Sequence, residues 1–357
     1  MAQPLVNSYT NWGKLKEVWL GDVYPSHFYD HLESQVRDVF YELTDRTKQD
    51  LSIIERKLTE LGVDVVRPVY KHLDDFILSD YHPTMPGQLA RPQICPRDHF
   101  LVYGNKLIGD RFYHLAWQHA IDKYRKDSSC TVIDDLRLEH LGYMSGANSV
   151  RVGQDLYLDV FYTDHGNRDQ MIQELEQKIQ PMFPNTRLHL LSNGGHVDAC
   201  FAVIKPGLLL TSGYFADYDR TFPNWSRINI AYPEFAKHQR SRFPAPDSNG
   251  KWWNTGGSTN QAFNEHVIKH ALDWVGNYTE TFFEVNCLVI DEHNVLMLGE
   301  NESVFRTLEQ HGVTAHSLPF RTRTFWDGGL HCITLDSRRE DSPVDLFPDR
   351  QDNIYYY

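Results

Sequence analysis

A repeated unit, rather than any single motif, most constrains what this chain can fold into. The unit is a hairpin with a short polar turn, followed by an amphipathic helix and then a lone strand. Alternating apolar residues and turn-forming pairs such as Gly104-Asn105 and Gly153-Gln154 support the hairpins. We predict hairpins at residues 99–109, 149–161, 199–211 and 286–298, helices at 112–125, 169–179 and 303–310, and lone strands at 130–133, 186–191, 227–231 and 313–318.

A fifth copy of the unit is split between the two ends of the chain. The strand after Cys332 has no partner further along, whereas residues 14–20 form a strand pattern that leads into a long helix at 32–61 and a strand at 63–69. Pairing the last strand with the first closes a ring, and closure removes exposed sheet edges. We therefore predict one α/β domain over residues 1–357, a closed five-bladed, pseudo-symmetric α/β propeller of ββαβ units. Irregular insertions are expected near 214–261 and 74–96.

Polar residues stand at the entrance to the first strand of every unit. They are Asp98, Asn148, His196 with Asp198, Glu284 or Asn286, and Cys332. The first two and Asp198 recur at intervals of 50 residues. Because equivalent positions of all units face one axis in such a ring, we expect these side chains to meet in one active site.

Cys332 has the surroundings of a nucleophile. It follows the pair Gly328-Gly329, where the backbone can turn sharply and approach a ligand closely. A thiol needs a base or cation to react near neutral pH, and His196 with Asp198 fits that need. Two simpler interpretations stay open at this point: a buried cysteine with a surface histidine, or a metal-binding His-x-Asp pair. The metal interpretation is weaker because no HExxH or CxxC motif accompanies it.

The composition narrows the classes of partner. A formal net charge of −13 disfavours nucleic acid and anionic membranes, so a small molecule is the expected partner. The start of the chain lacks a signal-peptide pattern, and no apolar run approaches the roughly 20 residues of a membrane span. The five cysteines are scattered and odd in number, which disfavours a disulfide framework. These observations predict a cytoplasmic protein.

Four segments resemble the guanidino-modifying enzymes, the penteins, and within them the amidinotransferases of the L-arginine:glycine amidinotransferase type. The resemblance runs nearly from end to end, and the last segment is similar to the nucleophile signature of that family. The segments are residues 6–12 with 15–18, 96–98, 196–199 and 328–334.

The resemblance implies a five-fold α/β propeller and assigns roles to residues. Cys332 would be the nucleophile, His196 the acid and base, and Asp198 its partner and a guanidinium ligand. Asp98 and Asn193 would contact the substrate. The implied reaction moves the amidino group of L-arginine, or of a related guanidino donor, to an amine acceptor through a covalent amidino-cysteine intermediate. It implies neither a cofactor nor a metal, and a homo-oligomer is possible.

The departures from the family pattern include Asn148 and Glu284, besides Gly195 before His196. Where such enzymes usually carry a guanidinium-binding aspartate, this chain has Asn148, which can accept a hydrogen bond but lacks the charge. Glu284 stands near the position of a small hydroxyl residue that helps to hold the amino-acid end of the donor. We include both among the expected substrate-binding residues, with a donor or acceptor that differs from the usual one.

Two other functions remain open on the sequence. Water could resolve the thioether in place of an amine, which would make the chain a guanidino hydrolase of the arginine deiminase or dihydrolase type. Alternatively, the propeller could bind its ligand without turnover. The presence of Cys332 and His196 argues against this last possibility, and Asn148 argues for it.

Overall fold

A computed structural model describes most of the chain. The described residues are 4–71, 77–78, 88–109, 114–134, 136, 138–141, 144–160, 168–191, 196–212, 218–230, 260–271, 274–275, 284–299, 301–350 and 353.

Five three-stranded sheets share one topology. In each, the middle strand pairs antiparallel with its hairpin partner and parallel with the third strand. Four sheets follow the chain in order: β5 (Phe100–Tyr103), β6 (Lys106–Gly109) and β7 (Thr131–Asp134); β8 (Ser149–Val152), β9 (Asp155–Asp159) and β10 (Arg187–Leu191); β11 (Phe201–Lys205), β12 (Leu208–Thr211) and β13 (Ser226–Asn229); β14 (Leu288–Asp291), β15 (Asn294–Leu298) and β16 (Thr314–Leu318). The repeated strand pattern expected from the sequence is therefore confirmed.

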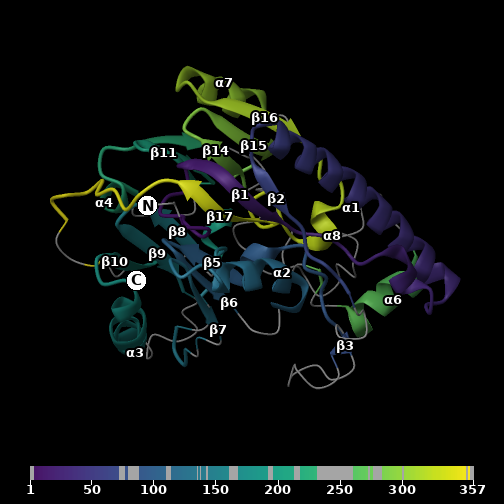
Figure 1. Cartoon of the computed structure of the whole chain (residues 1–357). Coiled ribbons are helices and arrows are strands. Elements are labelled where there is room, and N and C mark those ends of the chain that lie inside the picture. Colours follow the sequence, from purple (N-terminus) through teal and green to yellow (C-terminus); the bar gives the residue numbers. More distant parts are fainter. Residues whose placement is uncertain are drawn as a thin grey trace.

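The fifth sheet joins the two ends of the chain, as expected. Its middle strand, β1 (Lys14–Leu20), pairs antiparallel with β17 (Thr334–Glu340) and parallel with β2 (Asp64–Val66). In Figure 1 this sheet lies between β14–β16 on one side and the sheets of β5–β7 and β8–β10 on the other. The strand expected at 63–69 ends at Val66, because Pro68 has no N–H for the ladder.

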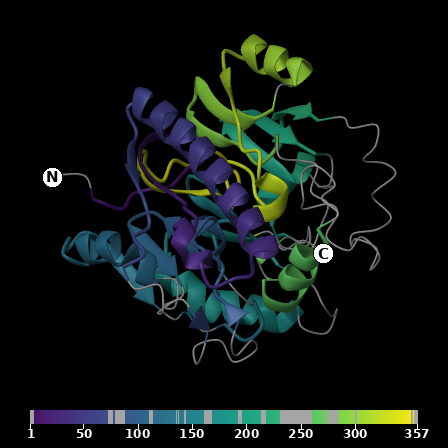
Figure 2. The same ribbon diagram turned by 90° about the vertical axis from the view of Figure 1, so that its right-hand side faces the viewer.

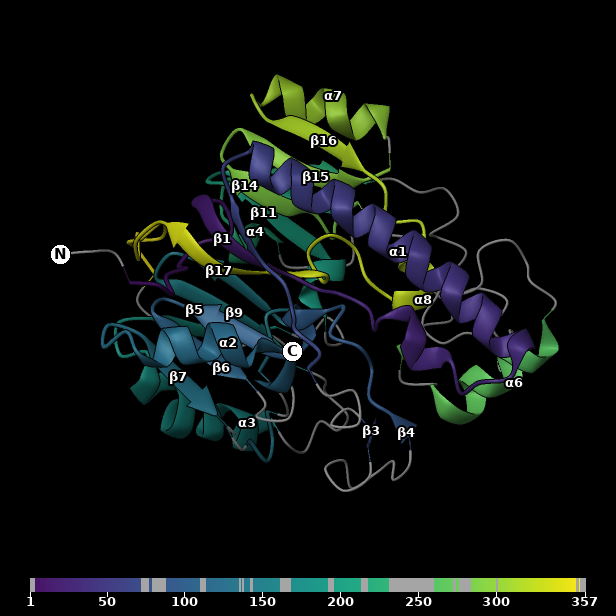
Figure 3. The same ribbon diagram turned by 45° about the vertical axis from the view of Figure 1, so that its right-hand side comes forward.

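The helices connect the second and third strands of most units. These connecting helices are α1 (Ser34–Glu60), α2 (His114–Arg125), α3 (Arg168–Glu174) with a π-helical continuation at Leu175–Ile179, α4 (Tyr218–Thr221) and α7 (Glu302–Gln310). Two further helices lie between units: α6 (Gln261–His270) precedes β14, and α8 (Arg323–Trp326) precedes β17. Figure 2 shows α1 crossing the molecule, and Figure 3 shows it running from β16 and α7 towards α6. A short strand pair, β3 (Ile77–Leu78) with β4 (Gln88–Leu89), lies in the smaller expected insertion. Within the larger one, α4 and β13 are regular, and residues 231–259 lie outside the described part.

Helix α1 supports the segment that leads to Cys332. Its apolar residues recur every three or four positions and face the core. From the same face, Thr47 Oγ1 accepts a hydrogen bond from Trp326 Nε1 at 2.9 Å. One turn further, Asp50 accepts the backbone N–H of Arg321 at 2.6 Å and also binds its guanidinium. The short helix α8, which the sequence analysis did not anticipate, is held in this way directly before the turn at Gly328-Gly329 that leads to Cys332.

A buried charge network ties several sheets together. Asp336 on β17 binds Arg97 Nη2 at 2.6 Å, Arg339 Nε at 2.6 Å and the guanidinium of Arg151. Arg151 lies on β8, and Arg339 also donates to the Val289 carbonyl of β14 at 2.8 Å. All four charged side chains are buried. The network therefore links strands from three sheets, and Arg97 joins it from the short 3₁₀ turn before β5.

Candidate active site

Asn286 fixes the position of Cys332. Its side-chain Oδ1 accepts the backbone N–H groups of His331 at 2.9 Å and Cys332 at 3.0 Å, and its Nδ2 lies 2.9 Å from Cys332 Sγ. Gly329 permits this contact, since a Cβ there would lie 2.6 Å from Asn286 Oδ1. Gly329 is thus required by its close approach to Asn286.

Asp198 also contacts the thiol of Cys332. Its Oδ2 accepts a hydrogen bond from Cys332 Sγ at 3.4 Å and from His331 Nδ1 at 2.9 Å. Its Oδ1 is buried and has no hydrogen-bond partner among the described residues. Burial alone would raise the pKa of Asp198, but the hydrogen bond from His331 and the nearby His196 and Arg97 hold it below its ordinary value. Burial first, and then Arg97, lowers the pKa of His331 to about 4, so this imidazole is neutral at pH 7.

Asp98 faces a guanidinium from its own chain. Its Oδ2 lies 3.4 Å from Arg91 Nη1, and its Oδ1 is buried without a partner in the described part of the chain. Arg91 Nη2 also donates to the Trp326 carbonyl and contacts Cys95 Sγ at 3.4 Å. Burial raises the pKa of Asp98, with His196 and Arg91 opposing the shift.

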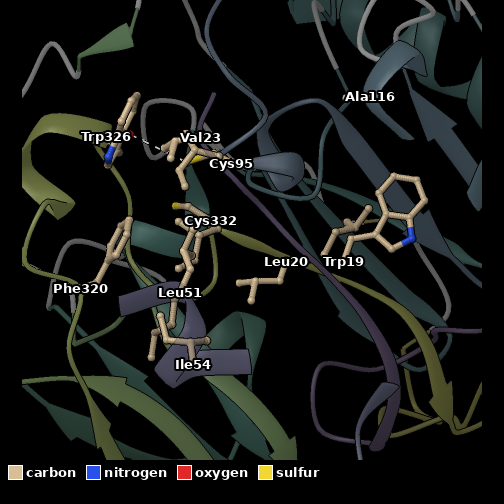
Figure 4. Close-up of a cluster of buried hydrophobic side chains, with 14 of the residues drawn as sticks. Trp19, Leu20, Val23, Leu51, Ile54, Cys95, Ala116, Phe320, Trp326 and Cys332 are labelled. Carbon is tan, nitrogen blue, oxygen red and sulfur yellow. Dashed lines mark hydrogen bonds between the residues drawn. The ribbon is translucent and has the colours of Figure 1, made fainter. Parts of the chain in front are cut away.

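Cys332 and Cys95 border the same turn from two sides. Figure 4 shows both sulfur atoms among apolar side chains that include Val23 and Leu51. A Cβ at Gly328 would lie 3.0 Å from Cys332 Cβ and 3.1 Å from Cys95 Sγ. Cys332 is 4% exposed. The apolar wall on one side and the polar groups of Asn286 and Asp198 on the other give the thiol two distinct faces.

Three further predicted residues differ in their surroundings. His196 is exposed, and its charge acts on Asp98 and Asp198. Asn148 is half-buried, and its Oδ1 accepts the backbone N–H of Ser145 at 2.8 Å and the hydroxyl of Ser145 at 3.1 Å. Glu284 is half-buried, and burial raises the pKa of its carboxyl against the attraction of Arg323. Asn193 lies outside the described residues.

The site contains residues that the sequence analysis did not select. Asn286 was one of two alternatives at its position, and Arg91, His331 and Asp327 received no role. Asp327 has a left-handed backbone, with φ of 51°, and precedes the glycine pair. Burial raises the pKa of Asp327 to about 6. The like charge of Asp98 adds to this shift, and the charges of Arg91 and His196 oppose it. In the sequence, the position of this aspartate directly before Gly328-Gly329 was the signal that could have revealed Asp327.

The described residues also limit other kinds of site. Among them, no group of three histidine, cysteine or carboxylate side chains could hold a metal ion. Of the helices within these same ranges, none has the length and apolar character needed to cross a membrane.

Known proteins similar to this chain carry out one kind of chemistry. No protein-family model matches it. It is 24% identical to inosamine-phosphate amidinotransferase 1 of Streptomyces griseus, over 94% of this chain and 97% of the relative. It is 23% identical to the mitochondrial glycine amidinotransferase of Xenopus laevis, over 54% of this chain and 38% of that protein.

Solved structures agree on the architecture. SxtG, an amidinotransferase of the saxitoxin biosynthetic pathway from Microseira wollei, superimposes with a TM-score of 0.66 at 19% identity, covering 96% of this chain and 100% of that one. The DDAH of Pseudomonas aeruginosa gives a TM-score of 0.51 at 15% identity, covering 90% and 99%. The fold is therefore of the pentein type. Within that class, the chain resembles the amidinotransferases over nearly its whole length.

Proposed function

We propose that the chain is an amidinotransferase in which Cys332 takes the amidino group from L-arginine, or a related guanidino donor, and passes it to an amine acceptor. The observation that carries the proposal is the setting of the thiol. Cys332 Sγ lies between Asn286 Nδ2 and Asp198 Oδ2, and Asp198 keeps a second buried oxygen without a partner among the described residues.

The unpartnered oxygens match a guanidinium. Oδ1 of Asp98 and Oδ1 of Asp198 are both buried, and neither has an acceptor role within the described ranges. A planar guanidinium offers donors in a fork that suits paired carboxylates. Leaving such oxygens unsatisfied costs about 1–3 kcal/mol each, which a bound donor would recover. Asn193, Asn148 and Glu284 remain predicted contacts for other parts of the substrates.

The chemistry balances without a cofactor. The thiol of Cys332 passes its proton to Asp198 or to solvent, and the thiolate attacks the central carbon of the guanidinium. The bond from this carbon to the donor nitrogen breaks, His196 protonates the departing amine, and an amidino-thioether remains on Cys332. The amine acceptor then attacks the same carbon, loses a proton, and expels the thiolate.

We further propose that the five sheets close into a five-bladed propeller whose axis passes through the site. The contacts of Asp336, the pairing of β17 with β1 and the contact of Asp198 with Cys332 support this closure. A small-molecule donor and acceptor as partners, a cytoplasmic location and a single domain belong to the same proposal.

Intact mass spectrometry tests the transfer. Wild type and Cys332→Ala are incubated briefly with L-arginine, and we expect wild type alone to gain the mass of one amidino group. Candidate amines should discharge this adduct and acquire the group. Discharge in buffer alone, with release of ammonia or urea, would instead indicate a hydrolase. An equal gain in mass by Cys332→Ala would rule out Cys332 as the carrier.

A further inference from the structure

Arg91 lies where a substrate guanidinium would be expected. Its Nη1 lies 3.4 Å from Asp98 Oδ2, its Nη2 donates to the Trp326 carbonyl, and the same nitrogen contacts Cys95 Sγ at 3.4 Å. The Arg91 side chain is 16% exposed, and that of Asp98 is 13% exposed. A guanidinium supplied by the chain itself thus binds one of the two carboxylates that we assign to the donor.

The contact between Arg91 and Asp98 leaves a hydrogen-bonding atom of each side chain without a partner among the described residues. Arg91 Nε is buried without a partner in the described part of the chain, and the same holds for Asp98 Oδ1. Arg91 and Asp98 therefore make one long contact instead of the forked pair that arginine and carboxylate favour. Buried groups left unsatisfied make a contact weak. This contact is suited to exchange, because a better-placed guanidinium would gain both missing bonds.

Arg91 also belongs to the cover of the nucleophile. Cys332 is 4% exposed, so a donor reaches it only if some side chain moves. Gly328 touches both Cys332 and Cys95, and Arg91 binds Cys95 and the carbonyl of Trp326, two residues before Gly328. Arg91 is therefore part of the layer of side chains beside the thiol.

Asp327 supplies a second carboxylate to the same place. It stands between Trp326, whose carbonyl binds Arg91, and Gly328, which touches Cys332. Its left-handed backbone costs a non-glycine residue about 1 kcal/mol or more, which is typical of functional positions. Its charge attracts Arg91 and repels Asp98. Asn148, by contrast, is neutral and uses its Oδ1 on Ser145.

We propose that the guanidinium of Arg91 occupies the place between the carboxylates of Asp98 and Asp327 in the donor-free protein. The guanidinium of the donor must displace it. This inference rests on the proposed function, because it takes the donor to be a guanidino compound. If Arg91 occupies this place nine-tenths of the time, the apparent affinity for the donor is about tenfold weaker.

Two alkylating reagents of equal shape test the proposal. Cationic 2-chloroacetamidine mimics a guanidinium, and 2-chloroacetamide is its neutral counterpart. In each case the Cys332 thiolate displaces chloride and forms a thioether, which intact mass spectrometry counts. In Arg91→Met we expect the half-saturating concentration of the amidine to fall about tenfold. The rate with the amide should change less than about twofold, since a neutral reagent does not need the carboxylates.

Matched variants separate displacement from general loosening. Arg306 on α7 is exposed, so Arg306→Met should behave as wild type with both reagents. Arg91→Lys, which cannot bridge Asp98 and Trp326 with a fork, should fall between wild type and Arg91→Met, and it serves as the second variant if Arg91→Met does not fold. Adding Asp327→Asn to Arg91→Met should raise the half-saturating amidine concentration at least about tenfold.

Several results would overturn the proposal. One is an unchanged or raised half-saturating concentration of the amidine in Arg91→Met. Another is a rise in the rates of both reagents by the same factor, which would make Arg91 a general steric cover. Failure of Cys332 in Arg91→Met to react with either reagent would also contradict it. Because alkylation does not require amidino transfer, the reagents report on Arg91 even if L-arginine leaves no adduct.

Discussion

Two buried groups of charges in this molecule use the same residue types in opposite ways. Around Asp336, one carboxylate meets three guanidinium groups, and both of its oxygens are bound. Around Cys332, the carboxylates of Asp98 and Asp327 attract the guanidinium of Arg91, and Asp198 accepts a hydrogen bond from His331. The first group has excess positive charge that backbone carbonyls help to satisfy. The second has excess negative charge and unpartnered oxygens within the described residues.

The difference teaches which group serves stability and which serves binding. A satisfied network holds strands in one arrangement, and breaking it leaves charges buried without compensation. Buried polar groups without hydrogen-bond partners destabilise the ligand-free protein. They are retained at sites where a ligand supplies the missing bonds. The active-site carboxylates therefore complement a cation, whereas the Asp336 network is already complete.

The largest expected effect comes from breaking the satisfied network. Asp336→Asn leaves three buried guanidinium groups without their shared carboxylate and should lower the free energy of unfolding by about 3–5 kcal/mol, measured by urea denaturation. The pKa of Asp336 lies well below its ordinary value, because burial is outweighed by the attraction of the three arginines. Its stabilising effect is thus present above about pH 4 and is lost as the pH falls, so the variant and wild type should converge in acid.

A surface pair provides the control for this substitution. Asp64 lies 3.3 Å from Arg338, and its side chain is 77% exposed. Asp64→Asn should change the free energy of unfolding by less than about 0.5 kcal/mol. If Asp336→Asn cost no more than this control, the network would not be the structural element that we infer.

Asn286 contributes both to stability and to the surroundings of the Cys332 thiol, and two substitutions separate these roles. Asn286→Ala leaves two buried N–H groups without their acceptor and should cost about 1–3 kcal/mol of stability. Asn286→Asp keeps that acceptor but puts a negative charge where Nδ2 meets Cys332 Sγ. It should retain more stability than Asn286→Ala, yet raise the pKa of the Cys332 thiol, because a like charge disfavours the thiolate. Alkylation rates of Cys332 against pH measure this shift, and equal pH profiles for wild type and Asn286→Asp would contradict it.

The sequence predicted the repeated architecture because each unit is specified locally. Turn pairs such as Gly104-Asn105 and alternating apolar runs recur in four units, and β1 was predicted with its observed bounds. The pairing of β17 with β1 followed from the need to leave no edge strand unpaired. The least accurate feature was α8, a single turn whose position depends on hydrogen bonds to the distant helix α1.

The candidate site was predictable in outline and not in detail. Spacing brought Asp198 and Cys332 together, and their side chains are in contact. It could not choose between Glu284 and Asn286, because residues two apart share one face of an extended segment. Arg91 could not be found, since it reaches the site through the carbonyl of Trp326, which is remote in sequence and carries no side-chain signal.

The last expected effect would sharpen the comparison, because it reverses the sign seen at Asp336. The pKa of Asp327 is raised to about 6 by burial and by Asp98, against the attraction of Arg91 and His196. Between about pH 4 and 6 the folded state therefore binds more protons at this group than the unfolded state, and wild type loses stability as the pH rises. Asp327→Asn has no carboxyl to ionise, so it should match wild type near pH 4 and exceed its free energy of unfolding by about 2–3 kcal/mol at pH 7.5. Urea denaturation at both pH values measures the difference. A gap that is constant or that shrinks towards pH 7.5 would mean that Asp327 is satisfied in the free protein, as Asp336 is, and would remove the contrast between the two groups of charges.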